Sequence, residues 1–288
     1  MVSQEQNTQL ISLHKMDELK SVILSMNRNS AAGLDCINGY FFQKCWHIIN
    51  DDLVGVVKAF FSGQMIPKYF SHSCVVLLPK VTNPNKLTEF MTICMRNFTR
   101  KTISKLVSTR LSCILPSLIY SNQFGFVNGR SISENIMLVQ EIIHHIKKPI
   151  IGSNGIIKLD MPKAYERVSW SYICLVLRKM GFAEIFIDMV WRIMDNNWYS
   201  IINGKRYGFF HCTRNLKKGD PLSHALFILG EEVLSRSLNT LHYHPDYYGF
   251  CMEKRRPQVN HLIFADYNTL HFKIVQNHEA FNKNPKGV

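Results

Sequence analysis

The stretch GIIKLD, residues 155–160, is a short apolar run that ends in an acid. A run of this length after a polar segment predicts a strand with Asp160 at its end. Two further apolar stretches within residues 261–272 predict a pair of strands, and they flank a predicted turn at residues 265–268. If these strands are neighbours in one sheet, the carboxylates of Asp160 and Asp266 converge at its edge.

Outward from this strand, apolar residues at helical spacing predict a series of helices. The clearest covers residues 131–146, where Ser131 and Glu134 have capping-box spacing and Pro149 follows. Its apolar face is expected to hold Ile136, Val139, Ile142, Ile143 and Ile146. Further helices are predicted at about residues 16–26, 51–61, 170–180, 184–196 and 223–241.

Two more strand signals occur outside the acidic strands. Residues 73–78 form an apolar run stopped by Pro79, and Asn203-Gly204 joins two apolar stretches as a hairpin. Helices and strands are mixed without a regular βαβ alternation, so the predicted fold class is α+β.

Composition favours a folded protein with a polyanionic partner. The chain has 288 residues, 46% of them hydrophobic, and a formal net charge of +13. The alternative is a basic protein that is merely cationic. Eight scattered cysteines without a C-x-x-C pair predict buried reduced thiols. No signal peptide or long apolar run is present, so we expect an intracellular protein without a membrane partner, nuclear or cytoplasmic.

Two carboxylates at one sheet edge suit divalent-metal chemistry. Mg²⁺ prefers hard oxygen ligands, and a pair of cations about 3.5–4 Å apart supports in-line phosphoryl transfer. The alternative for each Asp is a turn residue or a helix cap. A zinc site is the weakest interpretation, because the His and Cys residues lack paired clusters at zinc spacing.

Five motifs occur in a fixed order along the chain. They are LLPK at 77–80, NQFGFVNGRSI at 122–132, KLDMPKAYERV at 158–168, LKKGDPLS at 216–223 and FADY at 264–267. From about residue 17 to residue 272, the chain resembles the reverse transcriptases of plant-type non-LTR (LINE) retrotransposons. The resemblance implies an RNA-directed DNA polymerase with right-hand fingers and palm, in which an antiparallel palm sheet packs on helices.

The resemblance also implies roles for individual residues. Asp160 and Asp266 are the expected catalytic metal ligands, with the backbone of Met161, for Mg²⁺ or Mn²⁺. Expected nucleotide contacts are Lys80, Ala164, Tyr165, Lys218 and Gly219. Expected partners are an RNA template, a DNA primer and deoxynucleoside triphosphates.

Contacts with template or primer are expected from Gln123, Arg130, Lys101 and Lys105, and Arg100 and Arg110 are further candidates for phosphate contacts. Each has an ordinary alternative. Tyr165 could pack in the core, Lys80 could be solvated, Arg130 could belong to a turn and helix cap, and the basic helix could be a solvated face.

Several positions depart from the family pattern. Tyr267 stands where a second Asp is usual, Met91 replaces an Arg expected to clamp the triphosphate, and Pro162 replaces a small residue. Glu166 stands in place of Asp, Lys218 in place of Gln and His224 in place of Pro. These departures predict impaired polymerase activity; the alternative function is a catalytically dead remnant that binds nucleic acid non-specifically.

The expected organisation is a single reverse-transcriptase domain at residues 17–275. Its fingers lie at about 17–130 and its palm at about 131–275, with a return to the fingers near 170–218. Residues 1–16 and 276–288 are expected to be tails. The chain is too short for the thumb and the endonuclease, so we expect a fragment of a larger polyprotein.

Overall fold

The computed structural model describes residues 1–13, 15–146, 153–195, 198–203, 205–245, 247, 250, 259–265 and 267–274. The chain divides into two compact units. Unit 1 comprises Met1–Leu118 and Lys163–Gly230, and unit 2 comprises Ile119–Pro162 and Glu231–Val288. Both contain helices and antiparallel strand pairs, so the predicted α+β class is confirmed.

Unit 1 is rich in helices because its apolar residues recur at helical spacing. The predicted helix at about residues 16–26 is α2 (Met16–Ser25), in which Leu19, Val22 and Ile23 are buried. The helix predicted at residues 51–61 begins earlier, at Trp46. The unit also contains α3 (Gly39–Lys44), α4 (Trp46–Phe61), α5 (Lys68–Ser71), α6 (Phe98–Leu118), α8 (Ala164–Arg167), α9 (Trp170–Lys179), α10 (Glu184–Asp195) and the start of α11 (Pro221–Thr240).

The first residues do not form the tail that we expected. Gln4–Ile11 form α1, which begins with a capping box on Ser3. The Nδ2 of Asn7 donates to the carbonyl of Gly181 at 2.8 Å, and its Oδ1 accepts from the amide of Ala183 at 2.7 Å. This polar segment folds because one asparagine satisfies backbone groups far away in the sequence.

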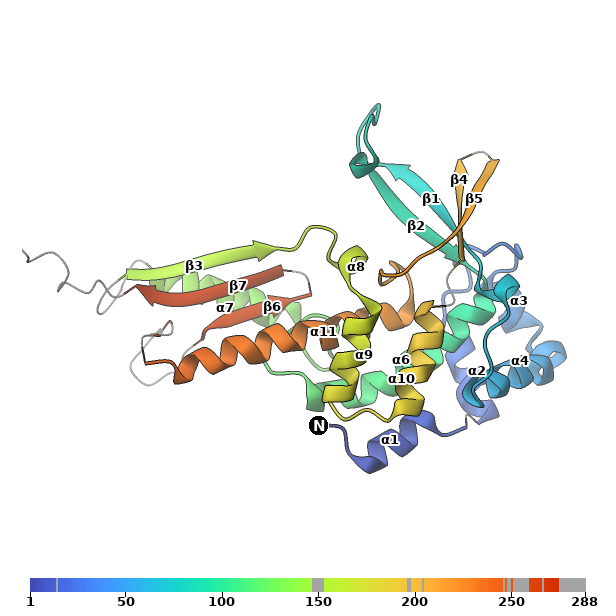
Figure 1. Ribbon diagram of the computed structural model, residues 1–288, viewed down its shortest axis with the longest axis horizontal. Helices are drawn as coiled ribbons and strands as arrows, with labels where there is room; N and C mark the ends of the chain where they lie inside the picture. The colour runs from blue at the N-terminus through green and yellow to red at the C-terminus, as the bar shows by residue number, and fades with distance from the viewer. Residues whose placement is uncertain are drawn as a thin grey trace, which may run out of the picture. The chain divides into compact units, whose positions relative to one another are not determined.

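A four-stranded sheet in unit 1 has the order β2-β1-β4-β5 (Figure 1). β1 (Ser73–Pro79) pairs antiparallel with β2 (Phe90–Arg96) and parallel with β4 (Trp198–Asn203). β5 (Lys205–His211) pairs antiparallel with β4. The predicted strand and the predicted hairpin are therefore confirmed, and Gly204 of the hairpin turn lies outside the described residues.

Unit 2 contains an antiparallel sheet of order β3-β7-β6 (Figure 1). Its strands are β3 (Ser153–Asp160), β7 (Tyr267–Ile274) and β6 (His261–Phe264). Because β7 begins at Tyr267, the connection from β6 is Ala265-Asp266, shorter than the predicted turn at residues 265–268. The prediction that the strand ending at Asp160 and the strands around residue 266 are neighbours in one sheet is confirmed.

Helix α7 (Ile132–Ile146) contacts β3 and β6 of this sheet. Of its predicted apolar face, Ile142 is buried, whereas Ile136 is 49% and Ile143 is 55% exposed. The predicted face was too wide, because neighbouring helical residues point about 100° apart. The cluster around Ile142 also contains Phe250 and Leu262, bordered by Phe124, Leu138, Val139, Ile156 and Val259.

The cysteines in the described residues are free thiols, and they are less buried than we expected. Cys74 and Cys174 are buried, but Cys36 and Cys113 are exposed. Cys251 lies outside the described residues.

Candidate functional site

The predicted acidic sheet edge is present in unit 2. Asp160 is the last residue of β3, it is exposed, and it pairs directly with Tyr267, the first residue of β7. Tyr267 also pairs with Phe264 on β6. Asp266 lies outside the described residues, but it directly precedes Tyr267 in the chain. The sheet therefore brings Asp160 opposite the residue that follows the second predicted ligand.

The turn before Asp266 has an unusual backbone. Ala265 has a φ of 52°, in the left-handed region that a residue with a side chain occupies at a cost. The surrounding contacts must therefore hold it there. On the other strand, pairing is continuous up to Asp160, so Pro162 lies beyond the ladder and removes no strand hydrogen bond.

The chemistry of Asp160 suits a hard cation. Its carboxylate is exposed at a strand end, and it has no ion pair with another residue in the described ranges. The backbone carbonyl of Met161 follows directly. Within the described residues, no group of three His, Cys, Asp or Glu side chains could hold a metal, so this edge is a partial set of oxygen ligands.

Two residues expected to contact template bind backbone groups within unit 2. The side chain of Gln123 is buried, and its Oε1 accepts from backbone amides. The guanidinium of Arg130 donates to the carbonyls of Ile119, Tyr120 and Gln123. Both side chains therefore form hydrogen bonds with backbone groups of unit 2.

In unit 1, Tyr165 on α8 is held from two directions. Its ring stacks on Phe227 with centroids 4.5 Å apart and an interplanar angle of 12°. Its hydroxyl lies 2.9 Å from the Nδ1 of His224, and burial lowers the pKa of that imidazole. Ala164, the other predicted nucleotide contact on α8, is buried. The orientation of the Tyr165 ring is therefore determined by α11.

Lys218 and Gly219 lie in the turn before α11. The Nζ of Lys218 is 3.4 Å from a carboxylate oxygen of Glu166, and the pair is partly exposed. Gly219 has a φ of 87°, which favours glycine, and a Cβ there would meet open space. The turn leaves room above Gly219, while the Lys218 ammonium already has a carboxylate partner.

Lys80 directly follows β1, and Met91 lies on the neighbouring strand β2 in unit 1. Lys80 is exposed directly after β1, and its amide donates to the carbonyl of Glu89 at 2.8 Å. Met91 is exposed on β2, opposite Leu78 on β1. The position at which we expected an Arg clamp is therefore on the surface, near the predicted Lys80 contact.

Lys101 and Lys105 line a groove of about 380 Å³ in unit 1. The other lining residues come from the end of α2 and the loop after it, and from the start of α11 and the turn before it; they include Asn27, Gly219 and His224. The Nζ of Lys101 donates to the carbonyl of Ala31 at 2.8 Å. Burial and then the charge of Arg96 lower the pKa of Lys101. The groove therefore has two lysines one helical turn apart in its lining.

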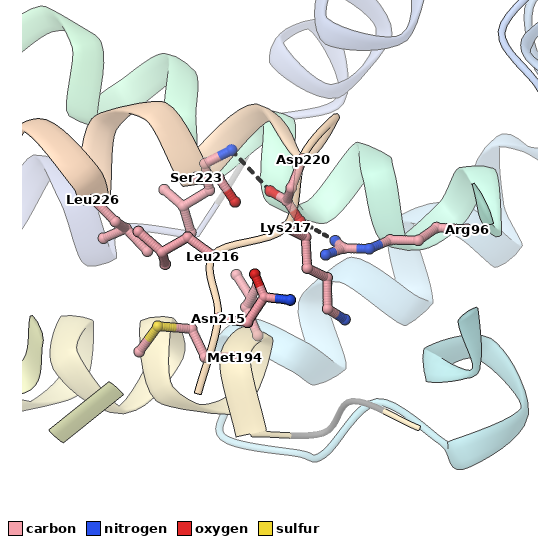
Figure 2. Close-up of a pocket in the computed structure, with 10 residues that line it drawn as sticks. Arg96, Met194, Asn215, Leu216, Lys217, Asp220, Ser223 and Leu226 are labelled. Carbon is pink, nitrogen blue, oxygen red and sulfur yellow. Dashed lines mark hydrogen bonds and ion pairs between the residues drawn. The ribbon is translucent and has the colours of Figure 1, made fainter. Parts of the chain in front are cut away.

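A buried charged cluster in unit 1 was not predicted. Arg96, at the end of β2, forms a buried ion pair with Asp220, which also accepts from the hydroxyl of Ser104 at 3.2 Å. Lys217 lies beside them, where a cavity of about 10 Å³ opens (Figure 2). Burial, and next Arg96 and Arg100, lower the pKa of Lys217 well below its usual range.

Arg100 belongs to the same interior. Only 1% of it is exposed, and it donates to the carbonyls of Ser71 and Ile193. The expectation that Arg100 contacts phosphate is therefore wrong, because the arginine is buried against backbone. Arg110 pairs with Glu18 at 2.7 Å and is also largely covered. Helical spacing alone does not reveal which cations of α6 face inward.

Comparison with known proteins identifies the class. The family model for the reverse transcriptase (RNA-dependent DNA polymerase) matches residues 81–283. The chain therefore belongs to the reverse transcriptase family, whose members depend on divalent metal and use nucleotides with a nucleic-acid template and primer. No helix in the described residues is long and apolar enough to cross a membrane.

Two of the proteins to which the chain is similar come from transposable elements. The chain is 26% identical over 239 residues to the transposon TX1 uncharacterized 149 kDa protein of Xenopus laevis, covering 81% of this chain and 18% of the relative. It is 29% identical over 169 residues to the Pol polyprotein of the type-2 retrotransposable element R2DM of Drosophila melanogaster, covering 58% and 15%. The chain is a reverse transcriptase domain of the non-LTR retrotransposon type, and it spans less than a fifth of these relatives.

Proposed function

We propose that this domain transfers nucleotides onto a primed RNA template through metal ions held by Asp160, Asp266 and the Met161 carbonyl. The observation that carries the proposal is the direct pairing of Asp160 with Tyr267, the neighbour of Asp266. Mg²⁺ bound there would neutralise the triphosphate and activate the primer hydroxyl. In this proposal, unit 2 is the palm and the sheet of unit 1 belongs to the fingers.

The nucleotide is proposed to contact Lys80, Ala164, Tyr165, Lys218 and Gly219. Tyr165 is suited to meet the sugar, because its ring is held by Phe227 and His224. Gly219 is suited to backbone approach, because the space above it is open. A phosphate must compete with Glu166 for Lys218, which weakens this contact relative to a free lysine.

The nucleic-acid backbone is proposed to bind the groove of Lys101 and Lys105. Gln123 and Arg130 do not enter this proposal, since the Gln123 side chain is buried with its oxygen bound to backbone amides and the Arg130 guanidinium already donates to backbone carbonyls. The affinity for an RNA–DNA duplex should fall steeply with salt. Replacing Lys105 with Gln should lower the slope of log affinity against log salt by about 1, whereas Lys179→Gln on α9 should not change it.

We further propose that catalysis is impaired in this chain. Tyr267 removes one carboxylate from the metal turn, and Met91 places a thioether on the exposed strand where the family has an Arg. The second candidate function, nucleic-acid binding without polymerisation, requires neither position. The basic groove is the observation that favours it.

Primer extension on an RNA template with Mg²⁺ tests the proposal. The natural chain is compared with the double substitution Tyr267→Asp and Met91→Arg, and with that variant carrying Asp160→Asn as well. We expect extension by the double variant alone. Strong extension by the natural chain would show that the departures are tolerated, and extension that survives Asp160→Asn would overturn the metal assignment.

A further inference from the structure

The segment of residues 119–130 meets the edge strand β6 of unit 2 at residues 122–124. Gln123 forms an isolated parallel bridge with Ile263. The amide of Phe124 donates to the carbonyl of Ile263 at 3.0 Å, and the amide of Ile263 donates to the carbonyl of Asn122 at 2.9 Å. This segment therefore extends the sheet beyond β6, next to the turn that leads to Asp266.

The side chain of Gln123 ties this segment to the turn. Only 1% of Gln123 is exposed. Its Oε1 accepts from the amide of Gly125 at 2.8 Å and from the amide of Ala265 at 3.3 Å. The same oxygen therefore accepts from one amide in its own segment and from one in the turn. The amide in the turn belongs to Ala265, the residue with the left-handed backbone.

Glycine at position 125 permits this close approach. A Cβ on Gly125 would lie 2.7 Å from the backbone nitrogen of Ala265, which is closer than real contacts allow. A side chain there would displace the loop from the turn.

Arg130 keeps the other end of the segment in place. Its guanidinium donates to the carbonyls of Tyr120 and Gln123, each at 2.6 Å, and to that of Ile119 at 2.8 Å. The carboxylate of Glu232 accepts from the amide of Tyr120 at 3.2 Å. The segment that carries Gln123 is therefore itself held in place by hydrogen bonds at several residues.

We propose that Gln123 is a positioning residue, whose side-chain oxygen holds the backbone of Ala265 and thereby the turn that carries Asp266. This inference rests on the proposed metal site, and it replaces the expected template contact. Groups that orient metal ligands without touching the metal commonly affect affinity about 10- to 100-fold. Gln123 acts through Ala265 alone, so the lower part of that range is expected.

Two measurements on the 288-residue chain test the inference without catalysis. The first is hydrogen exchange of the backbone around residues 264–267, and the second is Mn²⁺ binding followed by electron paramagnetic resonance. Gln123→Met keeps the length of the side chain but loses the acceptor, whereas Gln123→Glu retains an acceptor oxygen. Ser235→Ala, which removes a buried hydrogen bond to His261 in the same unit, controls for general loss of stability.

We expect Gln123→Met to speed exchange around Ala265 and to weaken Mn²⁺ binding about tenfold, with exchange protection recovered in Gln123→Glu. Ser235→Ala should change neither. Unchanged exchange in Gln123→Met would overturn the positioning role, as would equal changes in Ser235→Ala. Asp160→Asn separates the two proposals: if it leaves Mn²⁺ binding intact, the metal site is wrong, and the exchange result still decides the role of Gln123.

Discussion

Asp160 and Tyr267 are direct partners across the antiparallel strands β3 and β7. Their positions are more than a hundred residues apart in the sequence, and a shift of one residue in this register would exchange the faces of every side chain on β3. The register of this pairing therefore places Asp160 at the end of the sheet where the Ala265-Asp266 connection leads into β7. Tyr267 occupies the place directly opposite that carboxylate.

Asp160→Asn should abolish divalent-metal binding by this chain. The amide keeps the shape of the carboxylate but loses its charge, and a hard cation binds a neutral amide oxygen much more weakly than a carboxylate. Calorimetric titration with Mn²⁺ measures the effect. Asp188→Asn on α10 removes an exposed acid of unit 1 and serves as the matched control. Retention of full affinity in Asp160→Asn would exclude this sheet edge as the metal site.

Tyr165→Ala should relax discrimination against ribonucleotides in the Tyr267→Asp, Met91→Arg background. Removing the ring removes a clash with the 2′-hydroxyl, and pockets of this kind discriminate about 10- to 200-fold. Tyr165→Phe keeps the ring and its stacking on Phe227, so it should retain most of the selectivity. Competitive incorporation of deoxy- and ribonucleotides gives the ratio.

His224→Ala tests whether the hydroxyl contact matters for the same selectivity. It leaves Tyr165 stacked but removes its hydrogen-bond partner. An intermediate loss of discrimination is expected. Wild-type selectivity in Tyr165→Ala would show that Tyr165 packs in the core without meeting the sugar.

Asp220→Asn should destabilise unit 1 by about 3–5 kcal/mol, because it leaves the buried guanidinium of Arg96 without its counter-charge. Asp220 also accepts from the amide of Leu222 at 2.8 Å, near the start of α11. Urea unfolding measures the loss. Glu184→Gln, whose ion-pair partner Arg178 is also exposed, should leave the stability nearly unchanged. Adding Arg96→Met should recover part of the stability, and equal losses in both single variants would contradict the assignment.

Acidification should destabilise unit 2 through His261 and His271. Burial lowers the pKa of both rings from 6.5 to about 4, and His271 and then His242 add to the effect at His261. Between these values the unfolded chain binds more protons than the folded one, so the free energy of unfolding falls as pH falls from about 6.5 to about 4. At about 1.4 kcal/mol per pKa unit, each ring contributes on the order of 3 kcal/mol.

Urea unfolding at about pH 7 and about pH 5 measures this loss. The double substitution His261→Gln and His271→Gln should flatten the pH dependence of the free energy of unfolding. If the natural chain has the same free energy of unfolding at both pH values, the two histidines are protonated as easily in the folded state as in the unfolded chain.

The helices and strands were largely predictable because their signals are local. β3 was expected from GIIKLD, and α9 and α10 from apolar residues at helical spacing. α1 was missed because its sequence has little apolar pattern, and it is held by Asn7 contacts with residues 181 and 183. The width of the buried face of α7 was misjudged because only the tertiary contacts show how much of the helix the sheet covers.

The sequence by itself determined the family, the order of the motifs and the two acidic positions, since these depend on residue type and spacing along the chain. Only the tertiary structure decided which polar side chains face inward. Arg100 and Gln123 are buried because backbone carbonyls and amides far away in the sequence satisfy them. Burying a charged or polar group is unfavourable without such partners, and no local pattern encodes a partner that long-range packing supplies.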